Sequence, residues 1–182
     1  NPDIYFQGRE SSNGYYEAIP DIVADYMKQI SALTGREYKP FNYYGDPEAE
    51  RVIVAIGSVT EAAEEVVDYL RAKGEKVGLI KVHLYRPFSS KYFFDVIPKT
   101  VKKIAVLDRT KEPGAIGEPL YLDVKSLYYD RPNKPVIVGG RYGLGSKDVK
   151  PNQIIAVFEN LKANEPKDHF TVGIIDDVSH LS

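Results

Sequence analysis

The sequence predicts an α/β fold, a three-layer α/β/α sandwich with a mainly parallel sheet, preceded by a helical arm. Three observations lead to this prediction. From residue 51 onward, short β-branched runs alternate with helical patterns, as in βαβ units. These runs show no apolar–polar alternation, which is typical of strands that helices cover on both faces. The chain has 182 residues, enough to bury a full core without disulfides or a structural metal.

Residues 1–45 are predicted to form an arm and linker, and residues 46–182 the α/β domain. A helix is expected over residues 20–30, with Gly35 as its stop signal. The apolar residues of this helix share one face: Ile22, Val23, Tyr26, Met27 and Ile30. Residues 38–47 then form an extended linker, because their prolines disfavour helix. No partner for the apolar face is visible in the arm, so we expect it to be exposed and to dock another domain.

The domain is expected to alternate strands and helices to its end. The expected strands cover residues 51–57, 77–84, 103–108, 135–140 and 170–175. The expected helices cover residues 58–73, 89–97, 120–127 and 151–161. Ser58 and Glu61 have the spacing of a capping box at the start of the first of these helices. The turn at Gly57 could hold a phosphate at this helix N-terminus, but without a glycine-rich nucleotide motif an ordinary turn is the favoured interpretation.

Composition excludes several classes of protein. The chain has no cysteine, so it carries no disulfide, thiolate nucleophile or cysteine-ligated cluster. Its 24 Lys and Arg against 26 Asp and Glu leave no basic surplus for nucleic-acid binding. No apolar run approaches the length of a membrane span, and no secretory signal pattern is present, which favours the cytoplasm. His83, His169 and His180 are scattered, so no metal site is predicted, and no serine lies in a G-x-S-x-G nucleophile elbow, so no catalytic residue is predicted.

The segment 139–147 has the highest glycine density of the chain. Glycine permits positive φ and a close approach of backbone to a ligand, and cationic side chains stand at both ends of the stretch. Gly139, Gly140, Arg141 and Lys147 are therefore candidates for an anion-binding loop. The alternative is a long connecting loop without a ligand.

A second group of candidates follows two other strands. Arg109 and Lys111 come directly after the strand over residues 103–108, at the sheet edge where ligands collect in open α/β folds. Arg86 follows the strand over residues 77–84, on an expected neighbouring strand end, and the next residue is a proline that keeps it out of helical conformation. Arginine held in this way could grip a carboxylate or phosphate. Exposed ion pairs within a solvated loop are the alternative.

Several strings resemble the pyruvate:ferredoxin (flavodoxin) oxidoreductase family, also called pyruvate synthases. They occupy residues 1–7, 43–45, 49–55, 84–89, 105–115, 139–146 and 170–178, and the string over residues 105–115 is the most specific. The resemblance covers essentially the whole chain. It implies the second domain of such an enzyme, similar to the C-terminal domain of transketolases, with about five strands and one antiparallel edge strand. Residues 1–45 resemble the tail of the preceding pyrimidine-binding domain.

The resemblance also implies a reaction: pyruvate, coenzyme A and oxidised ferredoxin give acetyl-CoA, carbon dioxide and reduced ferredoxin. The family uses thiamine diphosphate with Mg²⁺ and [4Fe–4S] clusters, and its partners are ferredoxin or flavodoxin within a homodimeric enzyme. The Gly-Asp-Gly pattern of a diphosphate site is missing here, as are the cysteines, so no cofactor is expected on this chain. By the resemblance, Arg86, Arg109 and Lys111 would add positive potential near pyruvate or coenzyme A.

Two functions remain open at this point. The first is a non-catalytic structural and interdomain module of the oxidoreductase. The second is an autonomous module that binds an anion, such as a phosphate of coenzyme A, at the segment 139–147 or the turn at Gly57. An independent enzyme is disfavoured, because no nucleophile, metal site or acid–base pair is evident.

Overall fold

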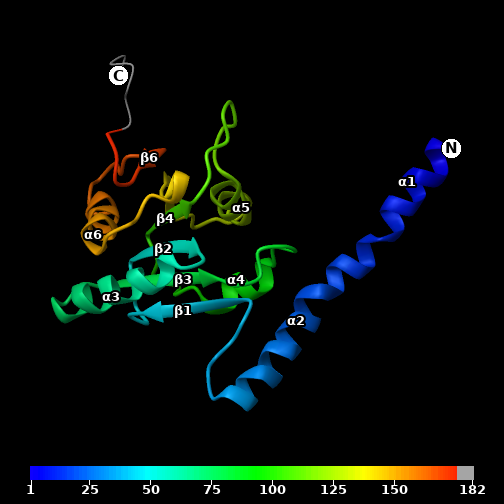
Figure 1. Ribbon diagram of the computed structural model, residues 1–182, viewed down its shortest axis with the longest axis horizontal. Coiled ribbons are helices and arrows are strands. Elements are labelled where there is room, and N and C mark those ends of the chain that lie inside the picture. The colour runs from blue at the N-terminus through cyan, green and yellow to red at the C-terminus, as the bar shows by residue number, and fades with distance from the viewer. Residues whose placement is uncertain (176–182) are drawn as a thin grey trace. The chain divides into compact units, whose positions relative to one another are not determined.

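The structure of the protein, a computed structural model, describes residues 1–175 (Figure 1). The helices are α1 (Pro2–Ser11), α2 (Asn13–Thr34), α3 (Val59–Ala72), α4 (Ser90–Val96), α5 (Pro119–Leu127) and α6 (Pro151–Asn160), with a 3₁₀ turn η1 (Leu144–Ser146). The strands are β1 (Phe41–Gly45), β2 (Arg51–Ile56), β3 (Val77–Val82), β4 (Lys103–Asp108), β5 (Val136–Arg141) and β6 (Phe170–Thr171). By their contacts these residues divide into two compact units. The first unit joins Asn1–Asn42 to Val82–Val96, and the second contains Tyr43–Lys81 and the described residues from Ile97 onward.

The strands form one sheet in the order β1-β3-β2-β4-β5-β6. β4 pairs in parallel with β2 and with β5, and β6 pairs in parallel with β5. β1 runs antiparallel to β3: the His83 N–H donates to the Pro40 carbonyl at 2.9 Å, and the Asp46 N–H donates to the Val77 carbonyl at 3.0 Å. The predicted mainly parallel sheet with one antiparallel edge strand is therefore confirmed. Its sixth strand is β1, which lies in the stretch expected to be a linker.

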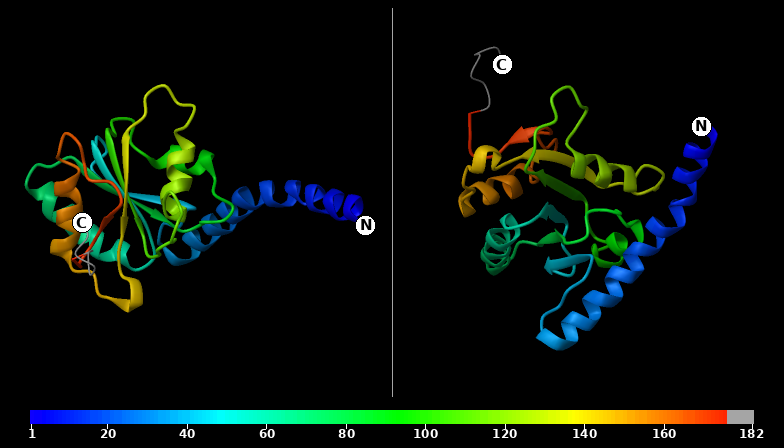
Figure 2. Two further views of the ribbon diagram at one scale, coloured as in Figure 1. Left: turned by 90° about the horizontal axis from the view of Figure 1, so that it is seen from above. Right: turned by 45° about the vertical axis from the view of Figure 1, so that its right-hand side comes forward.

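In the second unit, helices cover both faces of the sheet. α3 and α6 lie together on one face, and α5 lies on the other (Figure 2, left). One continuous core joins the sheet to α3 and α6 and includes Ile53, Leu79 and Phe158, all fully buried. The central strands are apolar on both sides because both sides are covered, as the absence of alternation predicted. The three-layer α/β/α prediction is confirmed.

The first unit consists of α1, α2, α4 and the loops that join them to the sheet strands. Its interior is aromatic: Phe41 packs edge-on against Phe88 and Phe93, with ring centroids 5.3 and 5.6 Å apart. Asp21 of α2 accepts hydrogen bonds from Lys91 at 2.8 Å and from the Tyr92 hydroxyl at 2.7 Å, both on α4. These contacts hold α4 against α2.

The arm is more helical than the sequence predicted. One helix was expected over residues 20–30, whereas α2 is 22 residues long and α1 precedes it. Pro20 lies inside α2, where it removes one backbone hydrogen bond without ending the helix. α1 begins where the Asn1 side chain accepts the Asp3 N–H, with a proline in the first turn. The expected exposure of the α2 face is confirmed for Ile22, Tyr26 and Ile30.

The capping box predicted at Ser58 and Glu61 is wrong. Ser58 has helical backbone angles, φ −62° and ψ −22°, and makes no side-chain capping bond. An N-cap residue needs an extended conformation to turn its hydroxyl towards the free N–H groups. The Thr60 hydroxyl instead donates to the Gly57 carbonyl at 2.8 Å and ties the turn to the helix. The last strand is also shorter than expected, since β6 ends at Thr171 rather than near residue 175.

Candidate functional site

The candidate site lies where β4 and β5 end. The two strands are parallel neighbours in register, and their last residues, Asp108 and Arg141, face each other across the ladder. The segments that follow the two strands therefore leave the sheet side by side. Ligands of open α/β sheets bind at this carboxyl edge, so it is the first place to look for a site.

A cavity of about 310 Å³ opens at this edge. Its lining consists of Lys111, Arg141, Tyr142, Gly143, Leu144, Lys147, Thr171, Val172 and Ile174. We call it the basic pocket. It brings together Lys111, which was predicted as a substrate-side cation, with Arg141 and Lys147 of the predicted anion loop. No carboxylate lines it, and its volume is at the lower end of the usual range for small-molecule sites.

A buried carboxylate lies beside two of these cations. Glu118, whose side chain is only 4% exposed, is 3.6 Å from Arg141 Nη1 and 3.8 Å from Lys111 Nζ. Arg141 also donates from Nη2 to the His169 carbonyl at 3.0 Å, and its side chain is 15% exposed. The arginine is thus fixed by contacts on two sides. Sequence reasoning missed Glu118, and a buried glutamate next to a proline carries no local signal of its partners.

The loop that closes the basic pocket has a defined conformation. Arg109 Nε donates to the Gly143 carbonyl at 3.0 Å, so this predicted site residue holds the loop rather than lining the cavity. Gly143 has φ +65°, in the left-handed region, where a side chain would also press against Arg109. The Tyr142 hydroxyl donates to the Ile56 carbonyl at 3.2 Å, and burial raises the pKa of this phenol. Arg109 and Tyr142 therefore tie the loop to β4 and β2.

Gly139 and Gly140 lie within β5, before the loop begins. A Cβ on Gly140 would stand 2.3 Å from the ring of Phe170, and one on Gly139 would stand 2.9 Å from the ring of Tyr121. The Gly139 N–H donates to Asp168 at 2.7 Å. Both glycines thus allow aromatic rings to pack on the strand, and that packing accounts for their presence without a ligand.

Asp168, which sequence reasoning did not single out, connects α5 with β5 and β6. Its carboxylate accepts hydrogen bonds from the Tyr121 hydroxyl at 2.6 Å, the Gly139 N–H and the His169 N–H. Burial opposes ionisation, but these three donors outweigh it and lower the pKa of Asp168. The network fixes His169, whose carbonyl in turn holds Arg141.

Asp108, the last residue of β4, supports the start of α5. Its two carboxylate oxygens each accept one backbone N–H, from Leu120 and from Tyr121, at 3.0 Å. Burial raises the pKa of Asp108, although the two N–H donors act in the opposite direction. Helix N-termini favour an acidic group in this position because their first N–H groups lack partners. Asp108 is a structural cap.

Arg86 follows β3 and belongs to the first unit, whereas Arg109 and Lys111 belong to the second. Its guanidinium lies 3.9 Å from the centroid of the Tyr85 ring and donates to the Tyr85 hydroxyl at 3.0 Å. The peptide bond between Arg86 and Pro87 is cis. The expectation that Arg86 and Arg109 follow neighbouring strands is wrong, because β2 separates β3 from β4 in the sheet.

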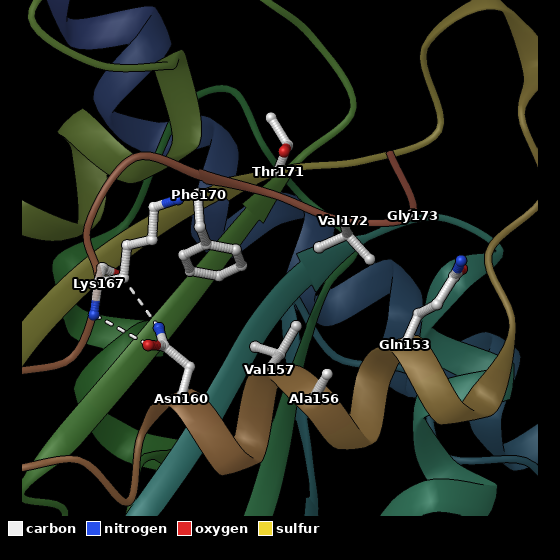
Figure 3. A pocket seen from close by; sticks show the side chains of 9 residues that line it. All are labelled: Gln153, Ala156, Val157, Asn160, Lys167, Phe170, Thr171, Val172 and Gly173. Carbon is white, nitrogen blue, oxygen red and sulfur yellow. Dashed lines mark hydrogen bonds between the residues drawn. The ribbon is translucent and has the colours of Figure 1, made fainter. Parts of the chain in front are cut away.

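A second cavity, of about 270 Å³, lies between α6 and the segment around β6 (Figure 3). Val157, Phe170 and Val172 give it an apolar wall. Asn160 on α6 closes one end through two hydrogen bonds of 2.9 Å to the Lys167 backbone. Its lining contains no pair of groups suited to acid–base chemistry.

Two kinds of metal site can be tested against the residues present. Residues 1–175 contain no group of three or more His, Cys, Asp or Glu side chains that could hold a metal ion. The whole sequence lacks the cysteines that a [4Fe–4S] cluster requires. His83 lies against the Lys39 carbonyl, His169 packs on Tyr121, and His180 lies outside the described residues. None of the described helices combines the length and apolar character needed to cross a bilayer.

Fold and site together define an α/β domain with a cationic pocket at the carboxyl edge of its parallel strands. The chain belongs to the family described as pyruvate:ferredoxin oxidoreductase core domain II, whose model matches residues 49–154. This confirms the resemblance that the sequence strings indicated.

Relatives match over the full length of the chain. It is 64% identical to a pyruvate-flavodoxin oxidoreductase of Enterobacter agglomerans and 60% identical to the pyruvate:ferredoxin oxidoreductase of Moorella thermoacetica. The chain spans only 16% of the length of each of these relatives. Among solved structures, the 2-oxoglutarate:ferredoxin oxidoreductase from Magnetococcus marinus, with 2-oxoglutarate, coenzyme A and succinyl-CoA bound, matches 72% of this chain and 21% of its own at 21% identity, with a TM-score of 0.46.

Proposed function

We propose that this chain forms the second domain of a pyruvate:ferredoxin or pyruvate:flavodoxin oxidoreductase. The complete enzyme oxidatively decarboxylates pyruvate with coenzyme A to acetyl-CoA and carbon dioxide, and two electrons pass to the carrier protein. The observation that carries this proposal is the 64% identity over all 182 residues to a protein named as a pyruvate-flavodoxin oxidoreductase. A cytoplasmic location and a homodimeric enzyme belong to the same proposal.

Within that enzyme we propose a non-catalytic role for the domain. Thiamine diphosphate with Mg²⁺ and the [4Fe–4S] clusters would supply decarboxylation and electron transfer from other domains. The polar groups at the carboxyl edge of this chain are largely engaged with one another: Asp108 caps α5, Arg109 holds the loop, and Glu118 pairs with Arg141. Polar groups that are bonded to one another in this way keep the edge rigid and do not supply a group that reacts with the substrate.

The partners of the domain would be the other domains of the same oxidoreductase. α2 buries only Pro20 among its own residues and exposes Ile22, Tyr26 and Ile30 on its surface. An exposed apolar stripe of this kind marks a surface that another protein surface covers. α1 adds Ile4, Tyr5 and Phe6, all more than 60% exposed.

The non-catalytic role has a direct test. The 182-residue chain, purified alone, should not oxidise pyruvate in the presence of thiamine diphosphate, Mg²⁺, coenzyme A and oxidised ferredoxin. The complete oxidoreductase, assayed in parallel, should reduce ferredoxin under the same conditions. Turnover by the chain alone would contradict the proposed role.

Arg86 is the residue of this chain that we propose to influence the substrates directly. Arg86 is an exposed residue whose guanidinium is supported by the ring and hydroxyl of Tyr85, which suits it to attract an anion such as pyruvate or coenzyme A. Arg86→Ala in the complete enzyme should raise the Michaelis constant of at least one of these substrates. Arg36→Ala, which removes another exposed arginine of the same unit, is the matched control. Michaelis constants that stay unchanged in Arg86→Ala would remove this role.

The second candidate function is an anion-binding module, and the basic pocket is the observation that favours it. Lys111 follows β4, whereas Arg141 and Lys147 both belong to the segment 139–147, and the three cations line one cavity without a carboxylate. Calorimetry of the 182-residue chain with coenzyme A, thiamine diphosphate and pyruvate separates the two functions. Binding at micromolar affinity by the chain alone would support the autonomous module.

A further inference from the structure

We propose that the basic pocket binds a phosphate monoester, held as a dianion between Lys111, Arg141 and Lys147. This inference specifies the ligand of the second candidate function above. It rests on the proposed function only where coenzyme A is named as the molecule that carries the phosphate. The pocket itself is defined by residues of the second unit alone.

The charge of the pocket selects a dianion. Three cations line it, and Glu118, a carboxylate with a side chain only 4% exposed, forms ion pairs with two of them, Arg141 and Lys111. Glu118 balances one positive charge, which leaves about two for a ligand. A phosphate monoester carries nearly two negative charges at neutral pH, whereas a monocarboxylate such as pyruvate carries one. The phosphate therefore balances the pocket, and the carboxylate leaves one cation unpaired.

The central cation is already in place before a ligand arrives. Arg141 is held by Glu118 on one side and by the His169 carbonyl on the other, so its planar fork loses little conformational freedom on binding. Its two contacts use only part of the five N–H donors of a guanidinium. The Lys147 backbone N–H donates to the Leu144 carbonyl, but its side-chain ammonium makes no hydrogen bond or ion pair with the other described residues, and the residue is exposed in the lining of the pocket. It is the cation with most freedom to close on the ligand.

The rest of the lining indicates an organic phosphate. Leu144 and Ile174 are about half exposed and lie in the same pocket as the cations, with Val172 buried behind them. These side chains give a ligand with an apolar body a surface to cover, which a bare phosphate ion would leave open. Coenzyme A, a substrate of the proposed reaction, carries one phosphate monoester and is therefore a source to test.

Lysine footprinting tests the site in the complete oxidoreductase. The enzyme is acetylated with acetic anhydride in chloride or in inorganic phosphate at equal ionic strength, and each lysine is quantified by mass spectrometry. Saturating phosphate should lower the acetylation of Lys111 and Lys147 at least about threefold. Lys99, which is exposed and lies outside the pocket, is the internal control and should not change. Equal acetylation of Lys147 in chloride and phosphate would overturn the proposal.

Two variants test the same site and leave Arg141 in place. Removing Arg141 would take one cation away from the buried Glu118 carboxylate and could destabilise the domain itself. In Lys147→Met, the phosphate concentration that half-protects Lys111 should rise about tenfold, the effect of one hydrogen bond between charged groups. Lys99→Met, the matched loss of one positive charge, should leave that concentration unchanged. A shift of equal size in both variants would show a general charge effect and refute a defined site.

Two further measurements show which molecule carries the phosphate and whether another part of the enzyme already covers the pocket. If coenzyme A protects Lys147 at lower concentration than inorganic phosphate and 3′-dephospho-coenzyme A does not, the monoester is that of coenzyme A. If Lys111 and Lys147 resist acetylation in chloride alone, another part of the polypeptide covers the pocket and the proposal fails. Ferredoxin reduction by pyruvate, measured on the same preparation, tests the proposed function separately, because lysine protection needs no turnover.

Discussion

Replacing Asp168 should destabilise the domain strongly, although a third of its side chain is exposed. Its carboxylate accepts hydrogen bonds at 2.6 Å from the Tyr121 hydroxyl, 2.7 Å from the Gly139 N–H and 2.8 Å from the His169 N–H. Each hydrogen bond to a charged group contributes about 1.5–3 kcal/mol when buried. With a discount for the water that reaches this site, Asp168→Ala should lower the free energy of unfolding by about 3 kcal/mol, and Asp168→Asn by about half as much.

The pH dependence of stability gives this prediction a second readout. The folded pKa of Asp168 is lowered, so the ionised group contributes stability at pH values above its unfolded pKa of about 4. That contribution is lost as the pH falls through the lower, folded pKa. The wild-type chain should therefore lose more stability below pH 4 than Asp168→Asn does.

Urea unfolding of the 182-residue chain, followed by far-ultraviolet circular dichroism at pH 7, measures the effect. The midpoint should fall with little change in the denaturant slope, which reports the surface exposed on unfolding. Tyr121→Phe removes one of the three donors, and a double-mutant cycle with Asp168→Ala should give a coupling of about 1 kcal/mol. A loss in unfolding free energy below about 0.5 kcal/mol in Asp168→Ala would refute the reasoning. The three hydrogen bonds would then stabilise the carboxylate no better than water does in the unfolded chain.

Three other outcomes follow from the same structure. Gly140→Ala should lower the free energy of unfolding by about 2 kcal/mol, as measured by thermal unfolding, because the new Cβ would stand 2.3 Å from the Phe170 ring. Gly8→Ala is the control: no atom lies near its Cβ position, so this substitution should be neutral or stabilising. Asp108→Ala should cost about 2–4 kcal/mol in urea unfolding, since it leaves the N–H groups at the start of α5 without their acceptor; an unchanged midpoint would contradict the capping role. Tyr26→Ser should change the stability of the chain by less than about 0.5 kcal/mol, but it should weaken the complete enzyme, as measured by its melting temperature, if α2 docks another domain.

The central strands could be predicted from sequence because burial on both faces leaves a direct mark. The apolar runs after residue 51 and before Asp108 have no polar interruption, and both turned out to be fully covered strands. β1 escaped prediction because it lies at the sheet edge and is only five residues long, with prolines near both ends. α1 was missed because it buries none of its residues, so its sequence carries no apolar stripe at helical spacing.

The candidate site was predictable residue by residue but not as a cluster. Lys111 was singled out for its position after a strand and Lys147 as a cation of the glycine-rich segment, yet only the order of strands in the sheet shows that β4 and β5 are neighbours. The same order separates Arg86 from Arg109, which sequence reasoning had placed on adjacent strand ends. Glu118 and Asp168 gave no signal, because the partners of a buried carboxylate are set by tertiary packing and not by local spacing.

The long α2 helix has a consequence for the chain when it is alone. A helix whose one fully buried residue is a proline gains little from tertiary packing beyond its contacts with α4, and its propensity is reduced by Gly14 and Pro20. Its amide protons should therefore exchange with solvent far faster than those of β4, and proteases should cut the arm before the sheet domain. In the complete enzyme the same amides should become slow to exchange, so the arm would report assembly of the whole protein.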